Sequence, residues 1–533
     1  MKKTAILKMM VILVTMLCSL SQTSAQTLTV TTSSGSTQVE ASEAGTMTYD
    51  SIAGTITIGG TAYNVSDISK IAITESGSSG ETSRTVSVVY NGSSATVTVS
   101  SDIADDVTVT QSGAHVNIAQ SDDVADEITY TLSGSSSDGE FYMSGSYKAT
   151  IELNGLTLTN ANPVTSGAAI HIQDGKRIKI KVVTGTDNTL VDAAGGSQKG
   201  CLYINGHAEF AQKGTLNVTG KVKHAIKTGD YCSLKNATIN VLGAVGDGIN
   251  CNEYFLMESG TINISGTSDD GIQCDIDGDS ATGETTDHED EDSGNIYIEG
   301  GTITVNCPSR DSEGIQCEGA IIISDGHVTV NAYDDAVNSG GDLTISGGYV
   351  YAHSTNNDGI DANGNCYIKG GVVYAIGASS PEVAIDANSE ERKQLYVTGG
   401  TIVAIGGLES GASISDGTCM YTSSWTENSW YALYNGNDLA LAFQTPTQSS
   451  SGNGGGPGGG GPGGGPGGGG SDQQLVVYTS STPTLKSGVT VSGGTEYFDG
   501  MGNVGGTVSG GSSVTLSTYT GGGSGPGGGP GWR

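Results

Sequence analysis

One short pattern recurs along the middle of the chain and limits the folds open to it. Its clearest copies hold an acidic residue, a glycine, an apolar residue, an amide and a cysteine. The copies read HAIKT (224–228), DGINC (247–251), DGIQC (270–274), EGIQC (313–317), DAVNS (335–339), DGIDA (358–362) and VAIDA (383–387). Their starting positions lie 22 to 25 residues apart, except for one interval of 43. A period of this length is typical of solenoids and arrays.

A second pattern, built on glycine followed by alternating β-branched residues, falls inside the intervals. It reads ESGTINI (258–264), EGGTITV (299–305), SDGHVTV (324–330), SGGYVYA (346–352), KGGVVYA (369–375) and TGGTIVA (398–404). The intervals have no helical periodicity, so each repeat is expected to consist of strands and turns. Such a unit buries its apolar face only by stacking on neighbours. We therefore predict an all-β, single-stranded parallel β-helix of about ten coils, spaced about 4.8 Å apart.

The repeat also assigns faces to its residues. In the 247–251 copy, Ile249 and Cys251 share one strand face, predicted to point inward, and Asn250 points outward. Cys251, Cys274 and Cys317 then form an inward column. Directly stacked parallel neighbours hold their Cβ atoms farther apart than a disulfide prefers. Thiols packed as small apolar groups are therefore the favoured interpretation.

Acidic residues open most copies and are expected to form a row along one corner of the rod. They are Asp247, Asp270, Glu313, Asp335 and Asp358. One interpretation is that each carboxylate only caps its own turn. The other is a cation site, because oxygen-bearing residues follow three positions later. These are Asn250, Gln273, Gln316, Asn338 and Asp361. Ca²⁺ takes 6–8 oxygen ligands of these kinds, so we predict calcium along this edge.

The 43-residue interval contains an acidic insertion (275–294), DIDGDSATGETTDHEDEDSG. Asp275, Asp277 and Asp279 have the alternating spacing of a calcium loop and are added to the predicted metal ligands. The segment is not an EF-hand, because Ser280 stands where that loop needs glycine. A solvated acidic loop without bound cations remains the alternative.

The net charge and the N-terminal segment indicate which partners and which cellular location to expect. The formal net charge is −34, which argues against a nucleic-acid partner because phosphate binding needs clustered Lys and Arg. Residues 1–25 have a basic start, an apolar stretch and a small-residue end, as in a secretory signal peptide. Leu17 stands where a small residue should precede a lipidated Cys18, which disfavours a lipoprotein. No later apolar run is long enough for a membrane helix, so a secreted or extracellular-surface protein is expected.

The two ends differ from the repeats. Residues 26–130 are predicted to form an N-terminal β module and cap, before a β-helix at 131–410. A C-terminal cap (411–451) contains Trp425 and Trp430, which are either sugar-stacking contacts or the core of that cap. A Gly/Pro-rich loop (452–470) and a C-terminal β segment with a Gly-rich tail (471–533) complete the chain.

Catalytic signals are weak. The seven histidines show no metal-ligand spacing. Asp269-Asp270 and Asp334-Asp335 are candidates for the paired carboxylates of glycoside hydrolysis, but the acidic row explains them equally well. A β-eliminating lyase needs a base beside calcium-bound acids, and Arg310 is the arginine placed for it. An enzyme is therefore the less favoured alternative.

The DGIN, DGIQ and EGIQ corners, preceded by KHAI and interleaved with GGTI, resemble one family. It comprises bacterial secreted carbohydrate-binding proteins built as right-handed parallel β-helices, akin to pectate lyases. The resemblance covers roughly residues 130–410, with similar capping sequence to about 520. It implies calcium-supported, non-catalytic binding of plant cell-wall polysaccharide, cellulose-like or pectin-like, with the corner acids near calcium. The N-terminal module, the insertion and the Gly/Pro tract fall outside it.

These observations leave three possible functions. The first is a calcium-stabilised polysaccharide-binding protein, with the outward residues Asn250, Gln273, Gln316 and Asn338 and the two tryptophans as candidate sugar contacts. The second is a calcium-dependent lyase or hydrolase of the β-helix class. The third is a structural surface adhesin whose partner is a protein or another cell.

Overall fold

The computed structural model describes residues 26–32, 35–40, 48–50, 53–58, 60–75, 84–278, 291–447 and 473–520. The predicted signal peptide, Asp279, most of the acidic insertion and the Gly/Pro-rich loop lie outside these residues. The chain divides into two compact units, with the boundary between Ser83 and Arg84. No helix among the described residues is long and apolar enough to cross a membrane.

Among the residues that the structure describes, the first unit forms two small antiparallel sheets. One has the order β2-β1-β6, and the other has the order β3-β4-β5. Their strands are β1 (Gln26–Thr32), β2 (Gly35–Glu40), β3 (Thr48–Asp50), β4 (Thr55–Ile58), β5 (Thr61–Asn64) and β6 (Ile68–Glu75). Ile56, Ile58 and Tyr63 are buried on the second sheet, in the alternation expected of a half-buried strand.

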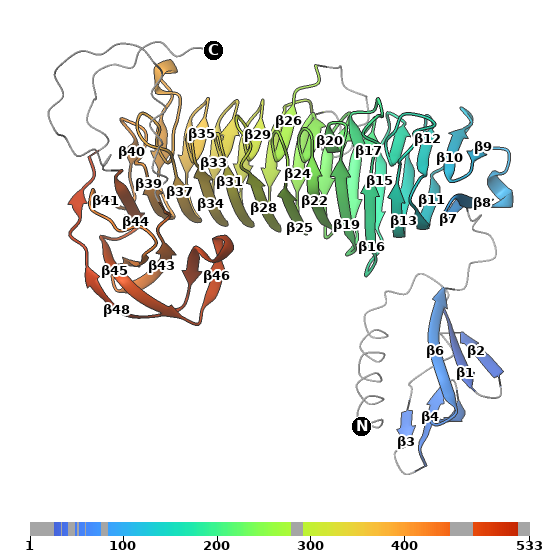
Figure 1. The fold of residues 1–533 in the computed structure, drawn as a ribbon. Helices are drawn as coiled ribbons and strands as arrows, with labels where there is room; N and C mark the ends of the chain where they lie inside the picture. The colour runs from blue at the N-terminus through green and yellow to red at the C-terminus, as the bar shows by residue number, and fades with distance from the viewer. Residues whose placement is uncertain are drawn as a thin grey trace. The chain divides into compact units, whose positions relative to one another are not determined.

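The second unit is a parallel β-solenoid of about 11 turns, so the predicted fold class is confirmed. Figure 1 shows its strands stacked coil upon coil along a rod. Each full coil contributes one short strand to each of three parallel sheets. No described residue lies in an α-helix; the helical turns are 3₁₀ segments, namely η1 (Ser101–Ile103), η2 (Ser389–Glu391) and η3 (Phe498–Gly500).

The front sheet contains the strands of the recurring DGI motif and the corresponding strands of the earlier coils. They are β10 (His115–Gln120), β12 (Glu140–Ser144), β14 (Ile170–Gln173), β17 (Gly200–Ile204), β20 (His224–Thr228), β23 (Ile249–Asn252), β26 (Ile272–Asp275), β29 (Ile315–Cys317), β32 (Val337–Ser339) and β35 (Ile360–Ala362). The register stacks Ile249 on Ile272 on Ile315, and Cys251 on Cys274 on Cys317. The predicted inward cysteine column is therefore confirmed. The eight cysteines of the described residues are buried and free.

The second sheet follows each front strand. Its strands are β15 (Ile178–Val182), β18 (Ala208–Ala211), β21 (Cys232–Leu234), β24 (Tyr254–Met257), β27 (Asn295–Ile298), β30 (Ile321–Ile323), β33 (Leu343–Ile345), β36 (Cys366–Ile368), β38 (Leu395–Val397) and β40 (Ser413–Ile414). The third sheet contains the GGTI strands and the corresponding strands of the earlier coils. They are β13 (Ala149–Thr159), β16 (Asp187–Val191), β19 (Thr215–Gly220), β22 (Thr238–Ala244), β25 (Thr261–Ser265), β28 (Thr302–Cys307), β31 (His327–Ala332), β34 (Tyr349–Ser354), β37 (Val372–Ile376) and β39 (Thr401–Ile405).

Antiparallel strands cap both ends of the rod. At the N-terminal end, β7 (Thr85–Asn91) pairs in parallel with β11 (Ile128–Ser136) and antiparallel with β8 (Ser94–Val99), while β9 (Val107–Ser112) pairs antiparallel with β10. At the other end, β44 (Leu475–Thr479) joins β39 to β41 (Thr418–Thr422), which pairs with β49 (Ser517–Thr518). Antiparallel partners satisfy strand edges that would otherwise template aggregation.

A C-terminal module covers part of the third sheet. Its six strands are β42 (Trp430–Asn435), β43 (Asp438–Gln444), β45 (Pro483–Ser492), β46 (Thr495–Tyr497), β47 (Gly502–Val504) and β48 (Thr507–Ser513). Tyr351 and Tyr374 of the third sheet share a buried cluster with Tyr431 and Phe443 of this module. The third sheet is thus partly occupied by the protein itself.

The glycine of the repeating motif is required by close packing. A Cβ atom on Gly314 would lie 2.0 Å from Val330 Cγ1 and 2.5 Å from the backbone oxygen of Ala336. Neither position is compatible with a real Cβ contact. The corner between the third and front sheets therefore leaves no space for a side chain at this position.

Candidate functional site

The outer face of the front sheet carries one continuous column of side chains, the outward column. It is aligned coil by coil and includes Tyr142, His171, Tyr203, Lys227, Asn250, Gln273, Gln316, Asn338 and Asp361. The four amides predicted as sugar contacts therefore lie in register. The front sheet runs along the rod from β10 to β35 in Figure 1.

Hydrogen bonds link the middle of this column into a ladder. Lys227 Nζ donates to Asn250 Oδ1 at 2.5 Å and to Asn252 Oδ1 at 2.8 Å. Asn250 Nδ2 donates to Gln273 Oε1 at 3.1 Å, and Gln273 Nε2 donates to Asp275 Oδ1 at 2.9 Å. Each amide is thus held in a fixed orientation, which reduces the ordering cost of binding a polar ligand.

Aromatic rings form the N-terminal part of the column. The His171 ring lies 4.7 Å from the Tyr142 ring and 4.9 Å from the Tyr203 ring, both edge-on. Tyr142 and Tyr203 are half-buried. Tyr and amide groups together offer an apolar surface and oriented hydrogen-bonding groups, which suits hydroxyl-rich ligands.

The corner acids, Asp247, Asp270, Glu313, Asp335 and Asp358, lie in one row just before the front strands. Their carboxylates bridge coils. Asp270 Oδ1 accepts from the Glu313 backbone N–H, and Asp335 Oδ1 accepts from the Asp358 backbone N–H, both at 2.8 Å. Four of the five are at most 9% exposed, and Glu313 is half-buried. Asp270 and Asp335 therefore each cap the turn of the next coil in addition to any role toward a cation.

Burial has a large effect on these groups. Burial, with smaller contributions from neighbouring carboxylates, raises the pKa of Asp270 to about 8 and that of Asp335 to about 9. For the same reasons the pKa values of Glu313 and Asp358 rise to about 7. Desolvation disfavours the charged form, and like charges add to that effect. These four acids therefore hold protons near neutral pH unless a cation replaces them.

Two groups of carboxylates lie at this edge, and within each group the ligand atoms are close enough to hold one ion. Asp247, Asp269 and Asp270 form the first group, with ligand atoms within 4.8 Å of one another. Asp247 is 1% exposed, and its Oδ1 accepts no hydrogen bond from the described residues. Its Oδ2 accepts a hydrogen bond from Asn250 Nδ2 at 2.6 Å and lies 3.0 Å from His224 Nδ1. A buried oxygen without a donor fits a cation ligand.

Asp358, Asp361 and Asp386 form the second group, within the same distance limit. It joins the corner row to the outward column, because Asp361 belongs to that column and Ile385 stacks on Ile360. Burial raises the pKa values of Asp361 and Asp386 as well.

The start of the insertion lies on the front sheet. Asp275 is paired in register with Asn252, one strand position beyond the cysteine column. Asp277 Oδ1 accepts from Asn252 Nδ2 at 2.7 Å, while the Asp277 backbone N–H donates to Asp292 Oδ1 at 2.8 Å. Asp275 and Asp277 thus extend the amide ladder sideways, and neither belongs to the two corner groups.

The two tryptophans lie in the C-terminal module. Trp425 Nε1 donates to the Gln473 backbone oxygen at 2.8 Å, and its ring packs against the cluster that joins the module to the third sheet. Trp430 begins β42 and is half-buried. The structure does not bring either residue to the outward column.

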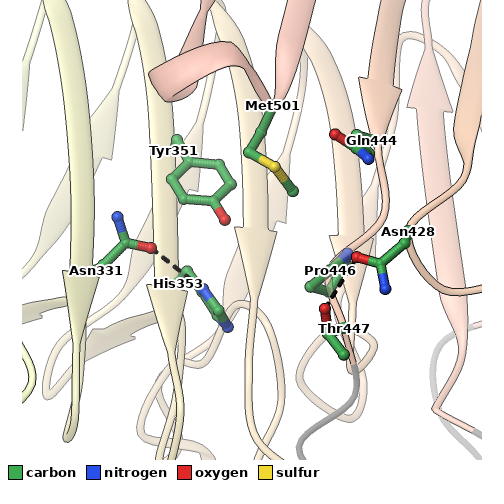
Figure 2. Close-up of a pocket in the computed structure, with 8 residues that line it drawn as sticks. All are labelled: Asn331, Tyr351, His353, Asn428, Gln444, Pro446, Thr447 and Met501. Carbon is green, nitrogen blue, oxygen red and sulfur yellow. Dashed lines mark hydrogen bonds between the residues drawn. The ribbon is translucent and has the colours of Figure 1, made fainter.

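A pocket of about 360 Å³ lies between the third sheet and the C-terminal module. Figure 2 shows its lining, in which His353 Nδ1 lies 3.3 Å from Asn331 Oδ1 and the Thr447 hydroxyl lies 2.9 Å from Asn428 Oδ1. Burial lowers the pKa of His353 to about 4, so the ring is neutral. None of the residues predicted from the sequence lines this pocket.

Several residues of the site were not among the predicted metal ligands or sugar contacts. Asp269 and Asp386 complete the two carboxylate groups, and Lys227 and Tyr203 extend the outward column. Lys227 stands at the amide position of HAIKT (224–228), so the repeat alignment held the signal for it. Tyr203 belongs to a coil whose sequence departs from the motif, and register alone reveals it.

Comparison with known proteins gave one family and one structural match. The model of a family described as carbohydrate-binding domain-containing protein matches residues 112–404. A solved polysaccharide lyase-like protein from C. thermocellum, a gadolinium derivative, matches with 19% identity and a TM-score of 0.35, covering 57% of this chain and 96% of that chain. No curated protein matches. The matched segment spans more than half of the chain and most of the solenoid, and the protein belongs to this family of carbohydrate-binding domain proteins.

Proposed function

We propose that the protein binds polysaccharide along the outward column of the front sheet, without catalysis, and that calcium supports the adjacent corner. Membership of a carbohydrate-binding family supports the ligand class. The observation that carries the location is the register-aligned ladder through Lys227, Asn250 and Gln273. Repeated polar groups at about 4.8 Å suit a repeating ligand.

The sugar contacts in this proposal are hydrogen bonds and ring contacts. Gln273, Gln316 and Asn338 are half-buried residues of the front face, and the Gln316 Oε1 atom is itself buried. Amides both donate to and accept from hydroxyls. Tyr142 and Tyr203 add apolar surface at one end. Asn250 is only 4% exposed and acts by orienting its neighbours.

Calcium fits the carboxylate groups at the corner. Asp247, Asp269 and Asp270 would hold one ion, and Asp358, Asp361 and Asp386 a second. The unpaired Asp247 Oδ1 and the all-oxygen donor set agree with a hard cation. A bound cation would favour the ionised form of the carboxylates whose pKa burial raises, such as Asp270 and Asp358.

The proposed setting is plant cell-wall polysaccharide outside the cell. The net charge of −34 repels acidic chains, so pectin-like polymers would need calcium between protein and polymer. Cellulose-like neutral chains would not. Chelation therefore separates the two ligand types: loss of binding indicates an acidic ligand, and retention a neutral one.

The lyase alternative finds little support at its candidate base. The Arg310 side chain is 82% exposed and pairs with the adjacent Asp311 at 3.4 Å. A catalytic base works within hydrogen-bond reach of the proton it removes, beside the charge-stabilising groups. An exposed arginine paired along the chain lacks that fixed placement.

The purified chain should bind at least one plant cell-wall polysaccharide in a panel of neutral and acidic polymers, and release no products. Binding is measured by affinity electrophoresis with and without chelator, and products by ultraviolet absorbance of unsaturated uronides and by reducing-end assay. Calcium-dependent product formation that disappears in Arg310→Ala would establish the lyase instead. Silence across the panel together with binding to cells would establish the adhesin.

A further inference from the structure

A group of side chains with the chemistry of metal ligands lies at the opposite corner of the coil, where the front sheet passes into the second sheet. It consists of His207, Asp230 and Glu253, which come from three successive coils. His207 directly precedes β18, Asp230 lies two residues before β21, and Glu253 directly precedes β24. Their ligand atoms all lie within 4.8 Å of one another.

The separations match those of ligands around a small ion. His207 Nε2 lies 3.2 Å from Asp230 Oδ2 and 3.3 Å from Glu253 Oε2. Ligands on a tetrahedral Zn²⁺, each about 2.0–2.1 Å from the ion, lie about 3.3 Å apart. The His207 Nε2 atom carries at most one hydrogen, which it can donate well to only one of the two carboxylate oxygens. An ion placed between the three ligand atoms would contact Nε2 and both oxygens.

The surroundings hold the imidazole in place. Its ring stacks on the Tyr231 ring at 4.4 Å with an interplanar angle of 11°, and Tyr231 stacks on Tyr254 at 4.7 Å. The Tyr231 backbone N–H donates to Glu253 Oε2 at 3.3 Å. Fixed ligands of this kind raise metal affinity because little ordering remains on binding.

Access is available from one side. The His207 side chain is 1% exposed, but that of Asp230 is 18% exposed. An ion can therefore enter past Asp230 and complete its coordination with water. We propose that His207, Asp230 and Glu253 bind one divalent transition-metal ion of the Zn²⁺ class and so link three coils of the rod.

The donor set separates this site from the calcium proposed at the acidic corner. Imidazole nitrogen with carboxylate oxygen is a common zinc ligand set, while Ca²⁺ prefers oxygen alone. Calcium at millimolar concentration should therefore not displace the ion. The proposal stands whether or not the protein binds polysaccharide.

Titration of the full chain with Co²⁺ after chelator treatment tests the proposal. We expect one site with visible absorption bands of four-coordinate cobalt, displaced by Zn²⁺ and not by Ca²⁺. Asp230→Asn should weaken the affinity at least tenfold, and His207→Gln should abolish the bands. Asp438→Asn, the same carboxylate-to-amide change at an exposed acid of β43 outside every proposed metal site, is the matched control and should leave the bands unchanged.

Two results would overturn the proposal: no stoichiometric Co²⁺ or Zn²⁺ binding by the folded chain, or equal affinities of Asp230→Asn and the unaltered protein. Asp230 is partly exposed, so its conservative variant is expected to fold, as circular dichroism will verify. That variant decides the question alone if His207→Gln does not fold.

Discussion

Chelation at pH 8.5 is expected to lower the melting temperature of the solenoid by about 5 °C, and acidification to pH 5.5 in the same chelator should recover much of the loss. A cation that binds only the folded chain stabilises it by about 2.7 kcal/mol at a hundredfold excess over its Kd. Two sites double that figure, and a chain of this size loses only a few degrees per kcal/mol.

The direction of the pH effect follows from the raised pKa values. Burial raises the pKa of Asp270 to about 8 and that of Asp335 to about 9, from about 4 in the unfolded chain. The folded state thus holds these protons more tightly. Their stabilisation is complete below about pH 4 and is lost as the pH rises through 7 to 9. Calcium should flatten this dependence by taking the place of the protons.

Thermal melting across pH 5.5–8.5, with calcium and with chelator, provides the measurement. Asp270→Asn should remove much of the calcium response, because its amide can still accept from the Glu313 backbone N–H but contributes no charge. Asp438→Asn, an exposed acid on β43, serves as the control. Identical melting curves in calcium and chelator at pH 8.5 would show that the corner acids only cap turns and do not bind calcium.

The second large effect concerns the motif glycine. Gly314→Ala should lower the free energy of unfolding by about 3 kcal/mol, since the added Cβ meets Val330 Cγ1 at 2.0 Å and the Ala336 backbone oxygen at 2.5 Å. The backbone oxygen belongs to the next coil, whose own strands fix it. Relief therefore requires the two coils to separate locally.

Gly195→Ala is the matched control, because its Cβ would meet no atom within 4 Å. It should change the free energy of unfolding by less than about 0.5 kcal/mol. Guanidinium denaturation followed by circular dichroism compares both variants with the unaltered chain. Equal stability of Gly314→Ala and Gly195→Ala would show that the corner tolerates a side chain.

Most of the solenoid could be predicted from the sequence, because each repeat of the sequence corresponds to one coil of the structure. Every coil stacks on the previous one, so a 23-residue interval places Asn250 on Gln273 and Cys251 on Cys274 without further information. The insertion left this register intact: Gln273 still stacks on Gln316, 43 residues later. Side chains at equal repeat positions are therefore predictable as columns.

Contacts between different repeat positions were not predictable. Trp425 packs under the C-terminal module because the chain returns after the Gly/Pro-rich segment, and no repeat encodes that return. The burial of the corner acids depends on the neighbouring turns. His207 meets Glu253 two coils away, and these residues share neither identity nor repeat position. Such pairs emerge only in three dimensions.

Binding along the outward column is tested by comparing the loss of its amides with the loss of equivalent amides on another face. The third sheet carries its own amide ladder, in which Asn240 Nδ2 donates to Asn217 Oδ1 at 2.8 Å and Asn263 Nδ2 donates to Asn240 Oδ1 at 2.9 Å. Two double variants thus remove equivalent amides from different faces. One is Gln273→Ala with Gln316→Ala on the front sheet, and the other is Asn240→Ala with Asn263→Ala on the third sheet.

The deciding measurement is the Kd of each double variant, by calorimetry, for a soluble fragment of the polysaccharide that the panel identifies. The front-sheet variant should bind about tenfold more weakly or worse, since each lost hydrogen bond costs about 0.5–1.5 kcal/mol, while the third-sheet variant should bind like the unaltered chain. Unchanged affinity in the front-sheet variant, or an equal loss in both, would contradict binding along the outward column.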